Sequence, residues 1–111
     1  MQIQSTQYRR VDLVEIGGRI DSSNSARLEE TFNEITEAKR FRIVVDMHDL
    51  EYISSRGLRA LIATLKETRR WNRGDLRLCR VAPRVQDVLD LAGLTPLFKI
   101  YDSTVDAVGS F

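Results

Sequence analysis

Two adjacent serines, Ser54 and Ser55, are the residues of this sequence best placed to do chemistry. They precede apolar residues at helical spacing, so a helix is expected to begin at this point. We expect Ser54 to be the N-cap, which accepts a hydrogen bond from a backbone N–H group of the first turn. Ser55 then takes the first helical position, where its hydroxyl is not needed for capping and faces water. Such a hydroxyl is a candidate for phosphorylation.

A phosphate on Ser55 would lie among unpaired N–H groups at the positive end of the helix dipole, with Arg56 and Arg59 nearby. The modified chain is therefore expected to stay folded. The effect of the phosphate would arise at a partner surface, through roughly −1.5 to −2 units of added charge. Gly57 lowers the helix propensity of this turn by about 1 kcal/mol relative to alanine, which indicates an open surface that something approaches closely. Spacing alone favours the alternative, in which both serines serve only to start the helix.

The residues that most enzymes use are scarce in this chain. His48 is the only histidine, Cys79 is the only cysteine, and no glycine-rich loop ends in Lys-Ser or Lys-Thr. We expect His48 to be a solvated loop residue. A metal site formed by Asp46, His48 and Asp49 is not expected, because the sequence supplies no further ligands beside them. We therefore predict that the protein is not an enzyme and uses no metal and no cofactor.

The net charge of +1 hides a strong segregation of charge along the chain. Residues 1–55 hold 7 basic and 10 acidic side chains, residues 56–84 hold 9 and 2, and residues 85–111 hold 1 and 4. Such segregation creates a local positive field that an acidic partner would meet. The second predicted helix and its end carry the basic side chains that project into one sector. These are Arg56, Arg59, Lys66, Arg70 and Arg73.

Strands and helices are expected to alternate along the chain. Strands are predicted at about 3–8, 11–16, 42–47, 76–81 and 97–101, with a turn or bulge at Gly17-Gly18 and a turn at 48–51. Helices are predicted after the capping residues 22–25, from 54 to about 70, from Pro83 to Gly93, and after Ser103. This order predicts an α/β fold, in which a mixed β-sheet packs against amphipathic helices.

The length of 111 residues predicts one domain, 1–111, with a single core that needs no disulfide. The lone cysteine fits a reducing compartment. No apolar run is long enough to span a membrane, and the polar start MQIQSTQYRR does not read as a signal peptide. We therefore expect a cytoplasmic protein that binds no membrane.

Five segments in family order make the chain resemble a STAS domain over nearly its full length. The chain looks most like the short, single-domain anti-sigma-factor antagonists (anti-anti-sigma factors) of bacteria. The segments that carry the resemblance are Gly18-Arg-Ile-Asp21, Ile43-Val-Val-Asp46, Leu50-Glu-Tyr-Ile-Ser54-Ser55-Arg-Gly57-Leu58, Leu76-Arg-Leu-Cys-Arg-Val81-Ala-Pro83 and Leu91-Ala-Gly93-Leu94.

The resemblance implies a partner-switching protein. Its unphosphorylated form would bind an anti-sigma factor with serine-kinase activity and thereby release a sigma factor. That kinase would phosphorylate a hydroxyl at the start of the second helix, here Ser55, and a phosphoserine phosphatase would restore the antagonist. The expected partner-binding surface comprises Asp21, Ser54, Ser55, Arg56, Gly57 and Arg59.

Two departures from the family pattern leave alternatives open. An acidic residue commonly precedes the phosphorylated serine, where this chain has Ser54, and a second hydroxyl residue often follows it, where this chain has Arg56. Ser54 is therefore the second choice for the phosphorylated residue. The first alternative function is a constitutive STAS scaffold subunit of a larger complex, without phosphorylation. The second is a nucleic-acid-binding module, although specific binders usually add a recognisable motif and a strongly basic pI, whereas this chain has a pI of about 7.9, so no direct nucleic-acid partner is expected.

Overall fold

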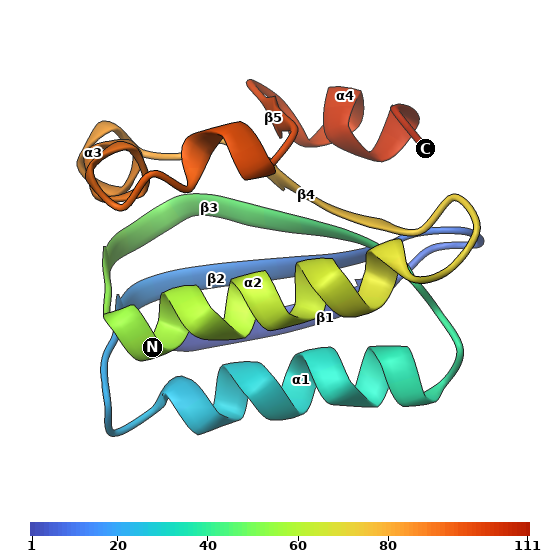
Figure 1. Cartoon of the computed structure of the whole chain (residues 1–111), viewed down its shortest axis with the longest axis horizontal. Helices are drawn as coiled ribbons and strands as arrows, with labels where there is room; N and C mark the ends of the chain where they lie inside the picture. Colours follow the sequence, from blue (N-terminus) through green and yellow to red (C-terminus); the bar gives the residue numbers. More distant parts are fainter.

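A five-stranded mixed sheet forms the centre of the protein, in the order β1-β2-β3-β4-β5 (Figure 1). The computed structural model describes all 111 residues. β1 pairs antiparallel with β2, and the remaining neighbours pair in parallel. The elements are β1 (Gln2–Gln7), β2 (Asp12–Ile20), α1 (Ser25–Glu37), β3 (Arg42–Ile53), α2 (Ser55–Arg69), β4 (Asp75–Cys79), α3 (Pro83–Leu91), the 3-10 helix η1 (Thr95–Leu97), β5 (Ile100–Tyr101) and α4 (Thr104–Gly109). The predicted α/β class with a mixed sheet is confirmed.

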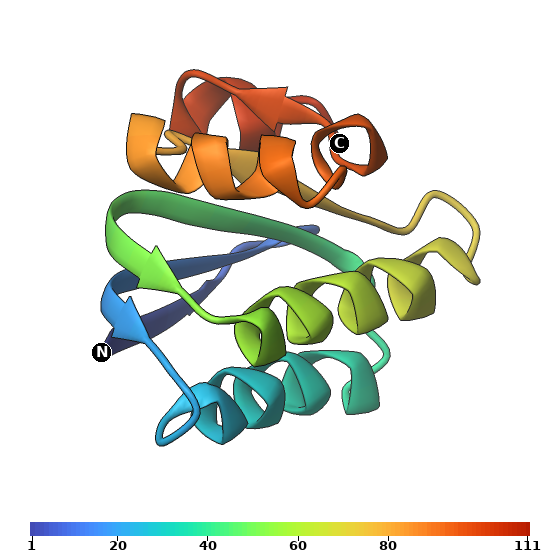
Figure 2. The ribbon, with the colours of Figure 1, turned by 60° about the vertical axis from the view of Figure 1, so that its left-hand side comes forward.

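The main core lies between the sheet and the helices α1, α2 and α3. Helices α1 and α2 run side by side, and their apolar faces meet alternate residues of the central strands (Figure 2). Val85 and Leu89 of α3 belong to the same core. Burying apolar surface stabilises a fold by about 25 cal/mol per Å², so this core is the main source of stability. Its fully buried side chains include Phe32, Ile43 and Leu61.

The second face of the sheet is only partly covered. Ala107 of α4 packs with Val44 and Cys79 in a small separate cluster. Farther along the same face, side chains such as Gln4 and Glu15 line an open cavity instead of meeting a helix. A strand with one wet face carries polar residues on that face, so hydropathy along β3 is mixed.

The structure corrects three predicted elements. β3 does not turn at 48–51 but continues to Ile53, because Leu50 and Ile53 are buried while the intervening residues are exposed. The last strand is limited to Ile100–Tyr101, since a 3-10 turn occupies Thr95–Leu97. The N-cap of α1 is Asn24, and no side chain caps its first turn.

Other local predictions are confirmed. Gly18 has φ +75°, and the register between β2 and β3 shifts beside it, which is the predicted bulge. Pro83 begins α3, and Gly93 lies just beyond that helix with φ +71°. The Ser103 side chain caps α4 by accepting a hydrogen bond from the Asp106 N–H group. None of the helices combines the length and the apolar character needed to cross a lipid bilayer.

Candidate functional site

The start of α2 has the cap geometry that the sequence predicts. Ser54 is extended, and its hydroxyl oxygen accepts a hydrogen bond from the Gly57 N–H group at 3.2 Å. The first main-chain bond of the helix runs from the Leu58 N–H to the Ser54 carbonyl at 2.9 Å. The Ser54 hydroxyl is therefore engaged in starting the helix, whereas the side chain of Ser55 lies outside this bonding.

Asp21 and the start of α2 lie at the same edge of the sheet. β2 and β3 are parallel, so their carboxyl ends meet, and Ile20 pairs with Ile53. The Ser54 N–H group donates to the Ile20 carbonyl at 2.8 Å, which joins the two loops directly. The predicted grouping of Asp21 with the two serines is therefore present in the fold. Ligands of open α/β sheets commonly bind at this edge.

Asp21 is held in a fixed and charged form by its own loop. Its Oδ1 accepts hydrogen bonds from the Ser23 hydroxyl at 2.6 Å and the Ser23 N–H at 2.9 Å. These bonds, chiefly the one from the hydroxyl, lower the pKa of Asp21 below its usual 3.8. The Asn24 side chain completes the loop by accepting from the Asp21 N–H at 2.9 Å and donating to the Arg19 carbonyl at 2.9 Å.

Ser55 is exposed at the first position of α2. The N–H groups of Ser55 and Arg56 precede the first main-chain bond of the helix, so they face outward with the positive end of its dipole. A phosphate here would need no burial and would meet favourable electrostatics. The geometry therefore permits modification of the folded chain.

The expectation that Gly57 leaves the surface open to a partner is wrong. The residue is buried, and a Cβ atom placed on it would lie 2.7 Å from Ile53 Cγ1 and 3.0 Å from Ile20 Cγ2. The close approach comes from the protein's own core, and Gly57 does not open the surface to a partner. It lets the first turn of α2 sit directly on the ends of β2 and β3.

The two arginines of the first turns differ in their surroundings. Arg56 Nε lies 3.6 Å from Glu29 Oε1 of α1, with both side chains about half exposed. Arg59 is exposed and has no carboxylate within ion-pair distance. It lines a groove between α1 and α2 with Glu29 and the small side chains Ala60 and Ala63. Arg73, which the sequence grouped with them, lies beyond the end of α2 and belongs to another surface.

Sequence reasoning missed two residues that border this edge. Tyr52 is 38 % exposed and pairs in register with Arg19, whose guanidinium carbon lies 4.4 Å from the centre of the tyrosine ring. Exposed tyrosine and arginine are the residue types enriched in binding hot spots. Their signal in the sequence was the alternation of Tyr52 with buried Ile53, which the expected turn at 48–51 obscured.

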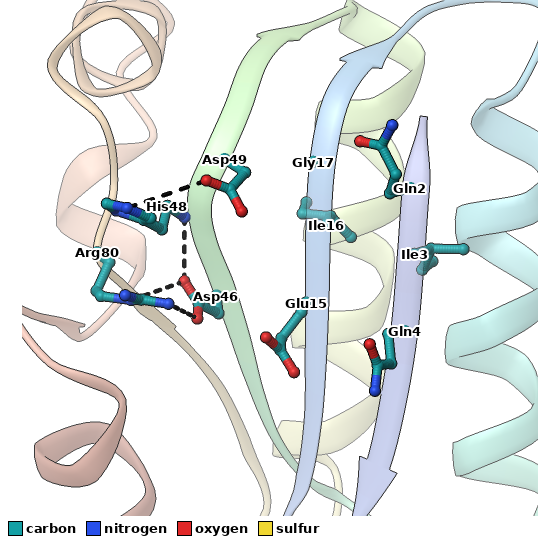
Figure 3. Close-up of a pocket in the computed structure, with 10 residues that line it drawn as sticks. All are labelled: Gln2, Ile3, Gln4, Glu15, Ile16, Gly17, Asp46, His48, Asp49 and Arg80. Atoms are coloured by element: carbon teal, nitrogen blue, oxygen red, sulfur yellow. Dashed lines mark hydrogen bonds and ion pairs between the residues drawn. The ribbon is translucent and has the colours of Figure 1, made fainter.

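A separate cavity of about 410 Å³ lies on the uncovered face of the sheet, and neither serine is among the residues that line it (Figure 3). Arg80 holds the Asp46 carboxylate there through contacts of 2.6 Å and 3.2 Å. This hydrogen bonding raises the pKa of the arginine. His48 is exposed in β3 and not in a loop, with Nε2 3.9 Å from Asp49 Oδ1. No three His, Cys, Asp or Glu side chains are grouped to hold a metal ion.

A model of the STAS domain family matches residues 2–107. The chain belongs to the STAS domain family. The predicted resemblance is thereby confirmed, and the five-stranded sheet with its four α-helices is a STAS fold.

Three proteins similar to this STAS chain are named as anti-sigma factor antagonists. The protein BtrV of Bordetella bronchiseptica, named as an anti-sigma factor antagonist, is 32 % identical over 94 residues, or 85 % of this chain and 80 % of BtrV. The anti-sigma F factor antagonist of Paenibacillus polymyxa is 28 % identical over 109 residues, or 97 % and 92 % of the two chains. Unphosphorylated SpoIIAA, an anti-sigma factor antagonist, superimposes with TM-score 0.85 at 17 % identity, covering 98 % of this chain and 95 % of that chain. SpoIIAA of Bacillus has also been solved in a phosphorylated form, with TM-score 0.78 at 15 % identity over 98 % of each chain.

Proposed function

We propose that this STAS protein is an anti-sigma-factor antagonist of the bacterial cytoplasm, switched by phosphorylation of Ser55. Its unphosphorylated form binds an anti-sigma factor with serine-kinase activity and releases the sigma factor that this partner had sequestered. Phosphorylation weakens the complex, and a phosphoserine phosphatase restores the antagonist. The protein acts by binding, as a regulator and not as an enzyme. The names of its relatives support the antagonist role.

The observation that carries the switch is the division of labour between the two serines. Ser54 caps α2, while Ser55 is exposed beside it with no structural bond to lose. A kinase that reaches Ser55 would add negative charge without unfolding the helix. The phosphorylated form of SpoIIAA is consistent with an antagonist of this fold that stays folded when modified.

The partner is proposed to dock across the edge formed by Asp21, Ser54, Ser55 and the first turns of α2. Arg56 and Arg59 give this surface positive charge, and Gly57 keeps α2 close to the sheet beneath it. A phosphate at the centre of such an interface would have to give up its hydration water on docking, and it would face a partner surface that fits a neutral hydroxyl. Weakening then follows from charge and desolvation, without a change of fold.

The test of the phosphorylation step is labelling by the anti-sigma kinase, captured from extract of the source cells on the unmodified protein. Intact mass should show one added phosphate on the native protein, and peptide mass mapping should place it on Ser55. Ser55→Ala should still capture the kinase and take up no phosphate, whereas Ser54→Ala should be labelled. Full labelling of Ser55→Ala would move the assignment to Ser54 or another hydroxyl.

One observation favours a second function, that of a constitutive scaffold subunit. Ser54 stands where the family commonly has an acidic residue, so a charge that orients the kinase is missing. In that case the protein from its own cells carries no phosphate even when the kinase is present. Capture of the same partner by Ser55→Asp and by the native protein would favour the scaffold.

A further inference from the structure

A cavity of about 460 Å³ at the opposite end of α2 is lined by six cationic side chains. They converge from separate elements: the β1–β2 turn, the start of β3, the end of α2 and the turn beyond it, β4, and the segment before β5 (Figure 1). Asp75 is the one acidic side chain in the wall, so the side chains of the lining carry a net charge of +5. The six cations are Arg10, Arg42, Arg69, Arg73, Arg77 and Lys99.

The floor of this basic cavity is rigidly built. Asp75 is buried, and its two carboxylate oxygens each hold one guanidinium, with Arg69 Nε at 2.9 Å and Arg77 Nε at 3.0 Å. Arg77 also donates to the Ser110 hydroxyl and carbonyl, at 2.6 Å and 2.7 Å, and lies 4.0 Å from the centre of the Phe111 ring. A shared carboxylate fixes two arginines in place while neutralising only one of them.

The rim of the cavity supplies four further cations without an ion-pair partner. Arg10, Arg42, Arg73 and Lys99 have no carboxylate within 4.0 Å, and each is exposed or half-exposed. Arg73 holds φ +62°, an uncommon conformation for a residue other than glycine. Like charges gathered from separate elements repel one another, so this arrangement costs stability unless an anion occupies it.

We propose that the basic cavity binds a short polyphosphate chain, either free or as the tail of a nucleotide. The concave shape favours a compact ligand, and its volume is in the range of small-molecule sites. Several cations spread around the wall match a ligand with charge on successive phosphates better than they match a single carboxylate. The one aromatic ring in the wall, Phe111, is already covered by Arg77, so recognition falls on the phosphates and not on a base.

This site is independent of the proposed switch at Ser55. α2 has 15 residues, which places its two ends about 22 Å apart at 1.5 Å per residue. A ligand in the basic cavity therefore leaves the edge with the two serines uncovered. The protein can lose one function and keep the other.

Titration calorimetry of the full chain with sodium triphosphate, in buffer at 150 mM NaCl, tests the proposal. We expect saturable 1:1 binding of triphosphate, weaker binding of pyrophosphate, and the weakest of orthophosphate, since each phosphate lost removes charge-assisted bonds. The double variant Arg42→Gln/Lys99→Gln should weaken triphosphate binding at least about tenfold. Its matched control, Arg27→Gln/Arg84→Gln, removes two exposed charges outside the cavity and should stay within about twofold.

Two further arms decide the ligand class. ATP and GTP should bind about as tightly as free triphosphate, and amide shifts in the native protein should cluster at Arg42, Gly74 and Lys99 without reaching Ser55. These shifts keep the test decisive should the double variant fold poorly. Absence of binding, equal loss in the control, or binding of one nucleotide but not of triphosphate would overturn the proposal. Tighter binding of a 20-base-pair duplex, lost in the same double variant, would replace it with a nucleic-acid site.

Discussion

At the scale of single residues, the neighbouring hydroxyls of Ser54 and Ser55 have different roles, because Ser54 is the N-cap of α2 and Ser55 is its first helical residue. Ser54 is extended and turns its oxygen back to the Gly57 N–H, whereas Ser55 is the first helical residue and faces water. The sequence was sufficient to predict this division, since capping depends on local spacing alone. Whether a kinase uses the exposed hydroxyl depends on a second protein, which local spacing does not encode.

Replacing each serine by alanine should separate the two roles. Ser54→Ala removes the hydrogen bond to the Gly57 N–H and should lower the free energy of unfolding by about 1 kcal/mol. Ser55→Ala removes no side-chain hydrogen bond and should change the free energy of unfolding by less than about 0.5 kcal/mol. Urea denaturation followed by circular dichroism measures both. A larger loss in Ser55→Ala would make that residue structural.

The loop of Asp21 gives a pH-dependent prediction at the same scale. The pKa of Asp21 is lower in the folded chain than in the unfolded one, so its contribution to stability is present above the unfolded value and is lost as pH falls through the folded value. Ser23→Ala removes the largest cause and should return the pKa toward 3.8. A carboxyl NMR titration checks this. An unchanged pKa would mean that the Ser23 hydroxyl is not the cause.

At the scale of elements, hydropathy predicted the helices and the central strands but failed where a strand has one wet face. Polar residues at 48–51 indicated a turn, yet β3 continues because Leu50 pairs with Gly18 of the bulged β2 and stays buried. The irregular register depends on pairing with a neighbouring strand, which no window along β3 can reveal. The basic cavity was missed because Arg10, Arg42 and Lys99 are distant in sequence from the neighbouring group of Arg69, Arg73 and Arg77, and only the fold brings them together.

The seating of α2 on the sheet predicts contrasting effects of two glycine substitutions. Gly57→Ala places a Cβ atom 2.7 Å from Ile53 Cγ1, so we expect a loss of about 1–3 kcal/mol despite the better helix propensity of alanine. Gly109→Ala in α4 meets no atom within 4 Å and should be neutral or stabilising by up to about 1 kcal/mol. Thermal or urea unfolding compares the two. Equal effects would show that the contact with Ile53 is readily relaxed.

At the scale of the whole molecule, the helix α2 separates two surfaces with different electrostatic tasks. The edge at its start combines Asp21 with Arg56 and Arg59, while the cavity at its end gathers six cations around Asp75 (Figure 1). The segregation of charge along the sequence indicated a positive field but placed it in one sector of α2. The fold divides it, because Arg73 lies beyond the helix and turns toward β4. The proposed partner and the proposed anion would therefore not compete for the same surface.

The affinity of the anti-sigma factor for three forms of the protein shows whether negative charge at Ser55 disrupts docking. Ser55→Asp should bind at least about tenfold more weakly than the native protein, because charge is placed where the partner meets a hydroxyl. Ser5→Asp on the edge strand β1 adds the same charge elsewhere and should bind as the native protein does. The melting temperatures of all three should be similar. Equal affinity of Ser55→Asp and the native protein for that partner would show that charge at Ser55 does not control binding.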